Sequence, residues 1–153
     1  MRVRLKHVPF AVGAMLCLSG CYPALRTVQP TAKIVVHDDA GRPLENATFT
    51  LATYRYPFPS PRSTQLAQFQ SDAAGAVSIP WRGVVQMEVL LPDGSAWYQW
   101  GYCIEKAGYG AVAVAEEKFD QPLSVVLQPH PGSSKCEWPG ENDGPYWGVK
   151  VVE

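Results

Sequence analysis

The residues best able to do chemistry in this chain are its four cysteines, Cys17, Cys21, Cys103 and Cys136. A thiol can form a thioether, pair in a disulfide or bind a metal as a thiolate. Neither the cysteines nor the histidines show the spacing of a zinc site, so no metal site is expected. The first question is therefore which cysteines are modified and which are paired.

Cys21 ends a segment that is typical of an export signal. Residues 1–7 are basic, and residues 8–18 are mostly apolar but too few to cross a bilayer. Small residues then precede the cysteine. We therefore expect residues 1–20 to be a signal peptide that takes no part in the fold.

The four residues Leu18-Ser19-Gly20-Cys21 resemble a bacterial lipobox. The resemblance implies that the Cys21 thiol carries a diacylglycerol, that the chain is cut before Cys21, and that the new amino group is acylated, for example with palmitate. An ordinary signal peptide with a coincidental cysteine is the alternative. Cys17 fits a lipobox poorly because Leu16 is not small.

The residue after the lipobox cysteine bears on location. In lipoproteins of bacteria with two membranes, Asp at this position tends to retain the protein in the inner membrane, whereas this chain has Tyr22. The resemblance thus implies an outer-membrane lipoprotein, which we expect to face the periplasm in preference to the cell surface. Residues 21–32 contain Pro23 and Pro30 and no periodic pattern, and they are predicted to be a lipidated tether.

The net charge of the chain limits the classes of partner that it is expected to bind. The formal net charge is −1, and loss of the three cations Arg2, Arg4 and Lys6 with the signal takes it to −4. An acidic chain without a basic stripe is not expected to bind nucleic acid.

Cys103 and Cys136 remain as an even pair in an exported chain, so we expect one disulfide, which stabilises the fold by roughly 3–4 kcal/mol in the chain-entropy model.

Residues 33–129 show short strand signals separated by turn residues. Alternation of apolar and polar residues predicts strands near residues 33–37, 47–51, 66–70, 77–81, 111–115 and 123–127, and no amphipathic helix is evident. Asp38-Asp39-Ala40-Gly41 and Asp72-Ala73-Ala74-Gly75 are predicted turns. This pattern predicts an all-β fold built as a single β-sandwich.

The strongest local signal is a hairpin over residues 84–104, with Asp93-Gly94 at its tip. That register would place Val85, Met87 and Val89 opposite Tyr102, Trp100 and Tyr98 on one face. The three aromatic residues are then core residues. The alternative is a sugar-binding platform on the strand face.

Three segments together resemble a known family. They are residues 35–47 (VVHDDAGRPLENA), residues 71–80 (SDAAGAVSIP) and residues 104–109 (IEKAGY). In this order they are similar to the carboxypeptidase regulatory-like domain, and the resemblance implies a single immunoglobulin/prealbumin-like sandwich of about seven strands. The resemblance implies non-catalytic adhesion or interaction roles and brings no active-site residues. Residues 54–65 and the tail after Pro129 depart from the family pattern.

Two aromatic groups are candidates for contact with a partner. Residues 54–59 are predicted to be an exposed loop, and Tyr54, Arg55, Tyr56 and Phe58, with Trp97, form the candidate binding surface. A loop packed on its own domain is the alternative. The second group is the tail, residues 130–153, which the predicted disulfide would pin to the sandwich so that Trp138, Tyr146 and Trp147 cover Leu90 and Trp97.

No catalytic residues are evident, because no serine has a base partner and the paired carboxylates are turn charges. Glu137, Glu141 and Asp143 could ligate calcium together with backbone carbonyls, but their spacing matches no calcium loop, so this is only a minor alternative. We therefore expect a membrane-anchored, non-catalytic binding or structural module in the periplasm, without cofactor and with an unidentified protein partner. The alternatives are a carbohydrate- or peptidoglycan-binding lipoprotein that uses exposed aromatics, and an enzyme whose residues cannot be paired from sequence.

Overall fold

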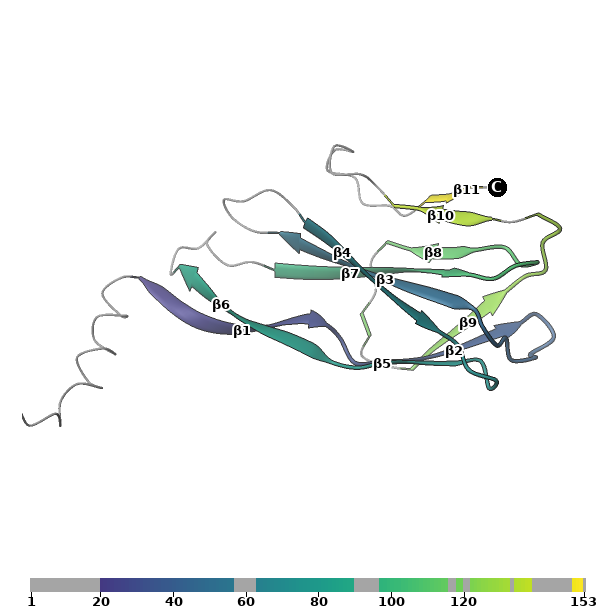
Figure 1. Cartoon of the computed structure of the whole chain (residues 1–153), viewed down its shortest axis with the longest axis horizontal. Coiled ribbons are helices and arrows are strands. Elements are labelled where there is room, and N and C mark those ends of the chain that lie inside the picture. The colour runs from purple at the N-terminus through teal and green to yellow at the C-terminus, as the bar shows by residue number, and fades with distance from the viewer. Residues whose placement is uncertain are drawn as a thin grey trace, which may run out of the picture.

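A computed structural model describes residues 20–56, 63–89, 97–115, 118–119, 122–132, 134–138 and 150–152. Every regular element among these residues is a β-strand, as Figure 1 shows. The strands are β1 (Cys21–Gln29), β2 (Ala32–Asp38), β3 (Thr48–Tyr56), β4 (Ser63–Gln70), β5 (Ala76–Ile79), β6 (Arg82–Val89), β7 (Trp97–Glu105), β8 (Val112–Val114), β9 (Leu123–Leu127), β10 (Lys135–Glu137) and β11 (Lys150–Val152).

In this part of the chain, seven strands form a sandwich of two sheets, ordered β5-β2-β9 and β4-β3-β7-β8. β2 is antiparallel to β5 and parallel to β9, and β3 is antiparallel to both β4 and β7. Two further antiparallel pairs, β1 with β6 and β10 with β11, stand apart from these sheets. The predicted all-β sandwich is confirmed.

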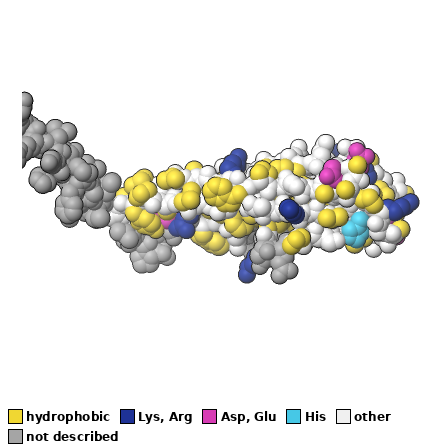
Figure 2. All heavy atoms as spheres, turned by 90° about the horizontal axis from the view of Figure 1, so that it is seen from below, with side chains coloured by type: hydrophobic (Ala, Val, Ile, Leu, Met, Phe, Trp, Pro, Cys, Tyr) yellow, Lys and Arg dark blue, Asp and Glu magenta, His cyan; other side chains and the backbone are white. Residues whose placement is uncertain are grey.

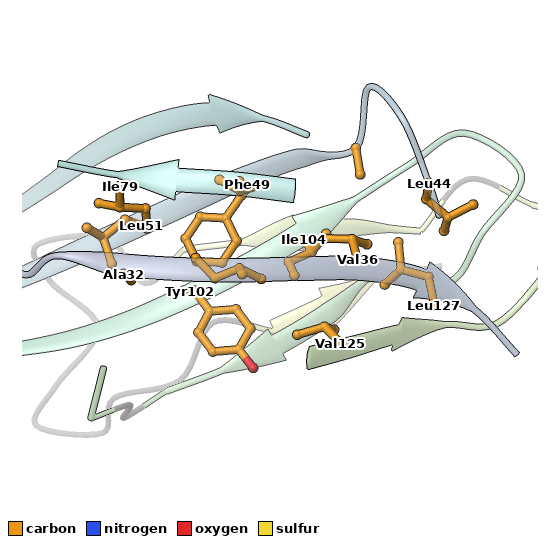
Figure 3. Close-up of a cluster of buried hydrophobic side chains, with 13 residues drawn as sticks. Ala32, Val36, Leu44, Phe49, Leu51, Ile79, Tyr102, Ile104, Val125 and Leu127 are labelled. Atoms are coloured by element: carbon orange, nitrogen blue, oxygen red, sulfur yellow. The ribbon is translucent and has the colours of Figure 1, made fainter. Parts of the chain in front are cut away.

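The core lies between the two sheets (Figure 3). β2 shows this arrangement: Ile34 and Val36 are buried, whereas Lys33 and Val35, which alternate with them, are exposed, and this period of two is typical of a strand with one buried face. From the other sheet, the Phe49 ring stacks on Tyr102 with centroids 5.2 Å apart. The remaining buried residues of this cluster are Ala32, Leu44, Ala47, Leu51, Val77, Ile79, Ile104, Val125 and Leu127.

The predicted hairpin of residues 84–104 is wrong. β7 pairs along its whole length with β3, and its Tyr102–Ile104 segment pairs on the other edge with β8. β6 pairs instead with β1, in a register that joins Cys21 to Val89 and Leu25 to Val85. β3 takes one edge of β7 along its whole length, and β8 takes the other edge at Tyr102, where the predicted pair with Val85 would lie. Residues 90–96, with the Asp-Gly turn, lie outside the described residues.

Of the three aromatic residues predicted to be core residues, Tyr102 and Trp100 contribute to the core without the hairpin, whereas Tyr98 is half-buried and is not part of the core cluster. Tyr102 is buried, and Trp100 packs half-buried against the core with its Nε1 donating to the Val28 carbonyl at 3.3 Å. Their strand partners are residues of β3, not of β6. Trp81 falls at the end of the strand predicted near residues 77–81, but it is 53% exposed and lies outside the core.

The predicted tether over residues 21–32 is wrong in its local structure, because Cys21–Gln29 forms β1 and Ala32 begins β2. Pro23 suppresses the strand signal in the sequence, but a strand that pairs on one edge only tolerates a proline. We call the β1–β6 pair the ribbon. Figure 1 shows it extending away from the sandwich at one end of the molecule.

The tail is joined to the four-stranded sheet by the Cys103–Cys136 disulfide, whose Cα atoms are 6.3 Å apart. The predicted disulfide is therefore confirmed. Cys103 pairs with Thr50 on the sheet face away from the core. Close by, the Cys136 amide donates to Glu105 Oε1 at 2.6 Å, and Ser134 Oγ accepts from the Ala111 amide at 2.5 Å.

Both predicted Asp-x-x-Gly turns are confirmed, and they have the same geometry. Asp38 Oδ1 accepts the amides of Ala40 and Arg42 at 3.0 and 2.8 Å, and Asp72 Oδ1 accepts the equivalent two amides at 2.9 Å each. The closing glycines, Gly41 and Gly75, have φ of +77° and +71°. Glycine adopts left-handed backbone of this kind without steric cost because it has no Cβ.

Gly41 and Gly75 share a left-handed backbone but differ in the space around them, so alanine substitutions at the two positions separate the cost of a steric collision from the cost of backbone conformation. A Cβ on Gly75 would collide with the Val36 carbonyl oxygen, whereas a Cβ on Gly41 would meet nothing within 4 Å. We expect Gly41→Ala to lower the free energy of unfolding by about 1–2 kcal/mol, the left-handed penalty alone. Gly75→Ala should lower it clearly further, because the backbone must also move. Chemical denaturation of the two variants measures the difference, and equal losses would contradict the predicted collision.

Candidate functional site

Cys21, the candidate lipidation residue, is the first residue of β1 and pairs with Val89 at the end of β6. Its side chain is half-buried and its thiol is not in a disulfide. Residues 1–19, which hold the predicted signal, lie outside the described residues. The cysteine therefore stands at the tip of the ribbon, directly on a paired strand.

One face of the ribbon carries a network of polar side chains centred on Glu88, which is only 3% exposed. The Arg26 guanidinium donates to both carboxylate oxygens, from Nε to Oε1 at 2.6 Å and from Nη2 to Oε2 at 2.5 Å. Tyr22 Oη and Gln86 Nε2 donate to the same carboxylate at 3.1 and 3.0 Å. Tyr98 of β7 then donates to Gln86 Oε1 at 3.2 Å, which links the network to the sandwich.

The network holds Glu88 as an anion. The hydrogen bonds from Arg26 are the main cause that lowers the pKa of Glu88 to about 2, against the opposing effect of burial, with help from Gln86 and Tyr22. The pKa of Arg26 is raised by the same bond. A bidentate pair of this kind fixes the relative orientation of two strands as well as neutralising their charges.

These residues were missed in the sequence. Glu88 stands in the apolar run of β6, and Arg26 lies in the segment predicted to be a tether. A charged residue inside an otherwise apolar strand signals a buried partner, because an isolated buried carboxylate is costly. The sequence does not say that the partner comes from a segment sixty-two positions away.

The residues predicted to form the candidate binding surface differ in their burial. Tyr54 is buried at 2% exposure, so its assignment to an exposed loop is wrong. Arg55 and Tyr56 are half-buried, and β3 continues through Tyr56. Phe58 lies outside the described residues. β3 pairs with β4 as far as Arg55 and with β7 as far as Tyr56, so residues predicted to be loop belong to the sheet.

Tyr56 and Trp97 are brought together at the ends of β3 and β7. Their rings stack with centroids 4.0 Å apart and planes inclined by 15°, and Tyr56 Oη donates to Gln99 Oε1 at 2.5 Å. Trp97 is 53% exposed, so the described part of the tail leaves it accessible, and Trp138 is half-buried. Leu90, Tyr146 and Trp147 lie outside the described residues. The result is a rigid aromatic pair with one accessible ring.

The groups that could suggest a metal site are otherwise engaged. The sulfurs of Cys103 and Cys136 and a carboxylate oxygen of Glu105 lie within 4.8 Å of one another. The two sulfurs are bonded to each other and the carboxylate accepts the Cys136 amide. This cluster offers no thiolate to a metal. Glu137 is exposed on β10, and Glu141 and Asp143 lie outside the described residues.

Polar side chains that line a pocket of about 240 Å³ beside this cluster are likewise engaged in hydrogen bonds. In its wall, Lys106 Nζ donates to the Glu45 carbonyl at 2.6 Å, Ser134 Oγ accepts the Ala111 amide, and Glu105 accepts the Cys136 amide. These side chains hold loops and tail in place. They are not arranged as a nucleophile with its base.

Comparisons with protein-family models, with curated proteins and with solved structures find no significant match to this chain. Within the part of the chain that the structure describes, no helix has the length and apolar character needed to cross a membrane. The function must therefore be argued from the residues themselves.

The Glu88 network predicts a specific acid response. Its folded pKa of about 2 lies below the usual 4.5, so its contribution to stability is present above pH 4.5 and is lost as the pH falls towards 2. We expect the difference in unfolding free energy between the wild type and Glu88→Gln to be largest above pH 5 and to shrink through this window. Denaturant titrations at several pH values measure it.

The control for this prediction is Glu45→Gln, which changes an exposed glutamate in the same way. Its difference from the wild type should stay small across the window. A Glu88→Gln difference that did not change with pH would show that the carboxylate is not held as an anion by Arg26.

Proposed function

We propose that this protein is a lipid-anchored, non-catalytic binding or structural module of the cell envelope, attached to the outer membrane through Cys21. The observation that carries the proposal is the coincidence of two boundaries. The lipobox-like sequence Leu18-Ser19-Gly20-Cys21 ends at the residue where β1 begins. A cut before Cys21 would leave all eleven described strands intact.

The non-catalytic part of the proposal rests on how polar groups are used. The buried Glu88 is neutralised by Arg26, and the buried Asp38 is bonded to Arg42 at 2.7 Å within its own turn. Both serve the fold. The family resemblance of the sandwich segments also implies adhesion or interaction in place of catalysis.

A second candidate function, binding of carbohydrate such as peptidoglycan, is favoured by the Tyr56–Trp97 pair. Sugar rings pack on aromatic faces, and a ring held by stacking presents its area with little loss of conformational freedom on binding. Trp97 is accessible and is fixed at a strand end. A protein partner could use the same anchor, since exposed tryptophan is typical of interface hot spots.

The anchor is tested by expressing the full chain in a bacterium with two membranes and measuring the mass of the purified protein. We expect residues 1–20 to be missing and Cys21 to carry acyl groups, with the protein in the outer-membrane fraction. Cys21→Ser should abolish both processing and acylation, because the thioether needs the thiol. Cys17→Ser is the matched control and should change neither. A free, alkylatable Cys21 thiol in the wild type would refute the anchor.

The carbohydrate function is tested by co-sedimentation with purified peptidoglycan. If the aromatic pair binds it, Trp97→Ala should weaken retention by at least about tenfold, as truncation of an aromatic anchor does. Trp81→Ala is the control, because Trp81 has the same 53% exposure but lies outside the pair. Equal retention of both variants, or no retention of the wild type, would reject this function and leave protein partners.

A further inference from the structure

The second face of the ribbon is apolar. In an antiparallel pair, residues opposite each other point to the same side. The pairs Cys21 with Val89, Pro23 with Met87 and Leu25 with Val85 therefore share one face, opposite to the face that carries Arg26 and Glu88. We call this the apolar face, made of Cys21, Pro23, Leu25, Val85, Met87 and Val89.

The apolar face is open to solvent. Leu25, Val85 and Met87 are 64%, 66% and 57% exposed, which makes them the most exposed large aliphatic residues of the described chain. Figure 2 shows hydrophobic side chains gathered at the end of the molecule formed by the ribbon. A contiguous exposed patch of this kind marks a contact surface.

Trp81 extends the apolar face at its inner end. Its ring occupies the space above Gly83, where an added Cβ would collide with it, and Leu25 Cδ1 lies 3.2 Å from that same position. Trp81 Nε1 donates to Thr27 Oγ1 at 3.2 Å. An aromatic ring with one polar tip is the type of side chain that proteins place at a membrane–water interface.

We propose that the apolar face lies flat on the bilayer surface beside the anchor, with Trp81 at the headgroup level. This inference rests on the proposed lipid anchor at Cys21. Cys21 belongs to the same face, so acyl chains on its sulfur would leave the protein on the side of Leu25, Val85 and Met87. Once anchored, these side chains meet the bilayer at high effective concentration, an advantage that no free partner shares.

The charges of the ribbon agree with this orientation. The apolar face carries no charged residue, whereas the Arg26–Glu88 pair lies on the other face and is internally neutralised. Contact would therefore depend on apolar burial and not on anionic lipid. Outer-edge backbone groups of a two-stranded ribbon need water or headgroups, which limits it to a shallow position.

The ribbon is attached to the sandwich by several hydrogen bonds. The Val28 carbonyl accepts from Thr53 Oγ1 at 2.9 Å and from Trp100 Nε1, and Gln29 Nε2 donates to the Pro80 carbonyl at 2.6 Å. A ribbon that lies on the membrane would thus set how the whole sandwich is held above it. The aromatic pair at Trp97 would be presented in one defined orientation.

The experiment uses the purified, acylated full-length protein in phosphatidylcholine vesicles whose acyl chains carry bromine, which quenches nearby tryptophan. We expect part of the fluorescence to be quenched and Trp81→Phe to remove that part. Trp97→Phe is the matched control, because both tryptophans are 53% exposed, and it should leave the quenching unchanged. If Trp81→Phe changes nothing, or if Trp97→Phe removes the quenching, the proposal is overturned.

A second measurement identifies what covers the apolar face in cells. A photo-reactive amino acid in place of Met87 should give lipid adducts, and the same probe in place of Leu66, which is 50% exposed on β4, should not. A cross-linked dimer, an adduct to another protein, or no adduct at Met87 would reject the bilayer as occupant.

Failure of the inference and failure of the anchor give different results. If the protein mass shows acyl groups on Cys21 but Met87 yields no lipid adduct, only the flat contact is refuted. If Cys21 is not acylated, the proposed anchor is refuted, and the inference that rests on it falls too.

Discussion

The pairing of β3 with β7 is the interaction on which the rest of this structure depends. It joins nine consecutive residue pairs, from Thr48 with Glu105 to Tyr56 with Trp97. Backbone donors and acceptors must be paired when a strand is buried, and each strand offers only two edges. With β3 along one edge of β7 and β8 on the other edge at Tyr102–Ile104, the predicted pair of Val85 with Tyr102 is excluded, and β6 pairs with β1. The ribbon, the buried Glu88 and the apolar face all follow from that exchange of partners.

The exchange changes how an anchor would act. A lipid on a tether would leave the domain free to rotate, whereas a lipid on the first residue of a paired strand transmits the orientation of the membrane to the sandwich. The Val28 carbonyl, with its two side-chain donors, connects the ribbon to the four-stranded sheet. Under the proposed function, the aromatic pair at Trp97 is then a contact site whose direction is set by the bilayer.

Polar chemistry in this molecule is used chiefly to build the fold. Asp38 and Asp72 close turns, Glu88 fixes the ribbon and Glu105 accepts the amide of the disulfide-bonded Cys136. Each of these carboxylates accepts hydrogen bonds that hold a turn, the ribbon or the tail in place. Such groups stabilise the scaffold, and under the proposed function the surfaces left for recognition are aromatic or apolar.

Local patterns in the sequence were sufficient to predict the all-β class, the strand near residues 33–37, both Asp-x-x-Gly turns and the Cys103–Cys136 bond, because each depends on spacing or on residue type. Strand partners depend on competition between distant edges, which no local pattern reports. Only the tertiary structure therefore decided that β6 joins β1, that Tyr54 is buried while Trp97 is accessible, and that Cys21 shares a face with the exposed side chains of the ribbon.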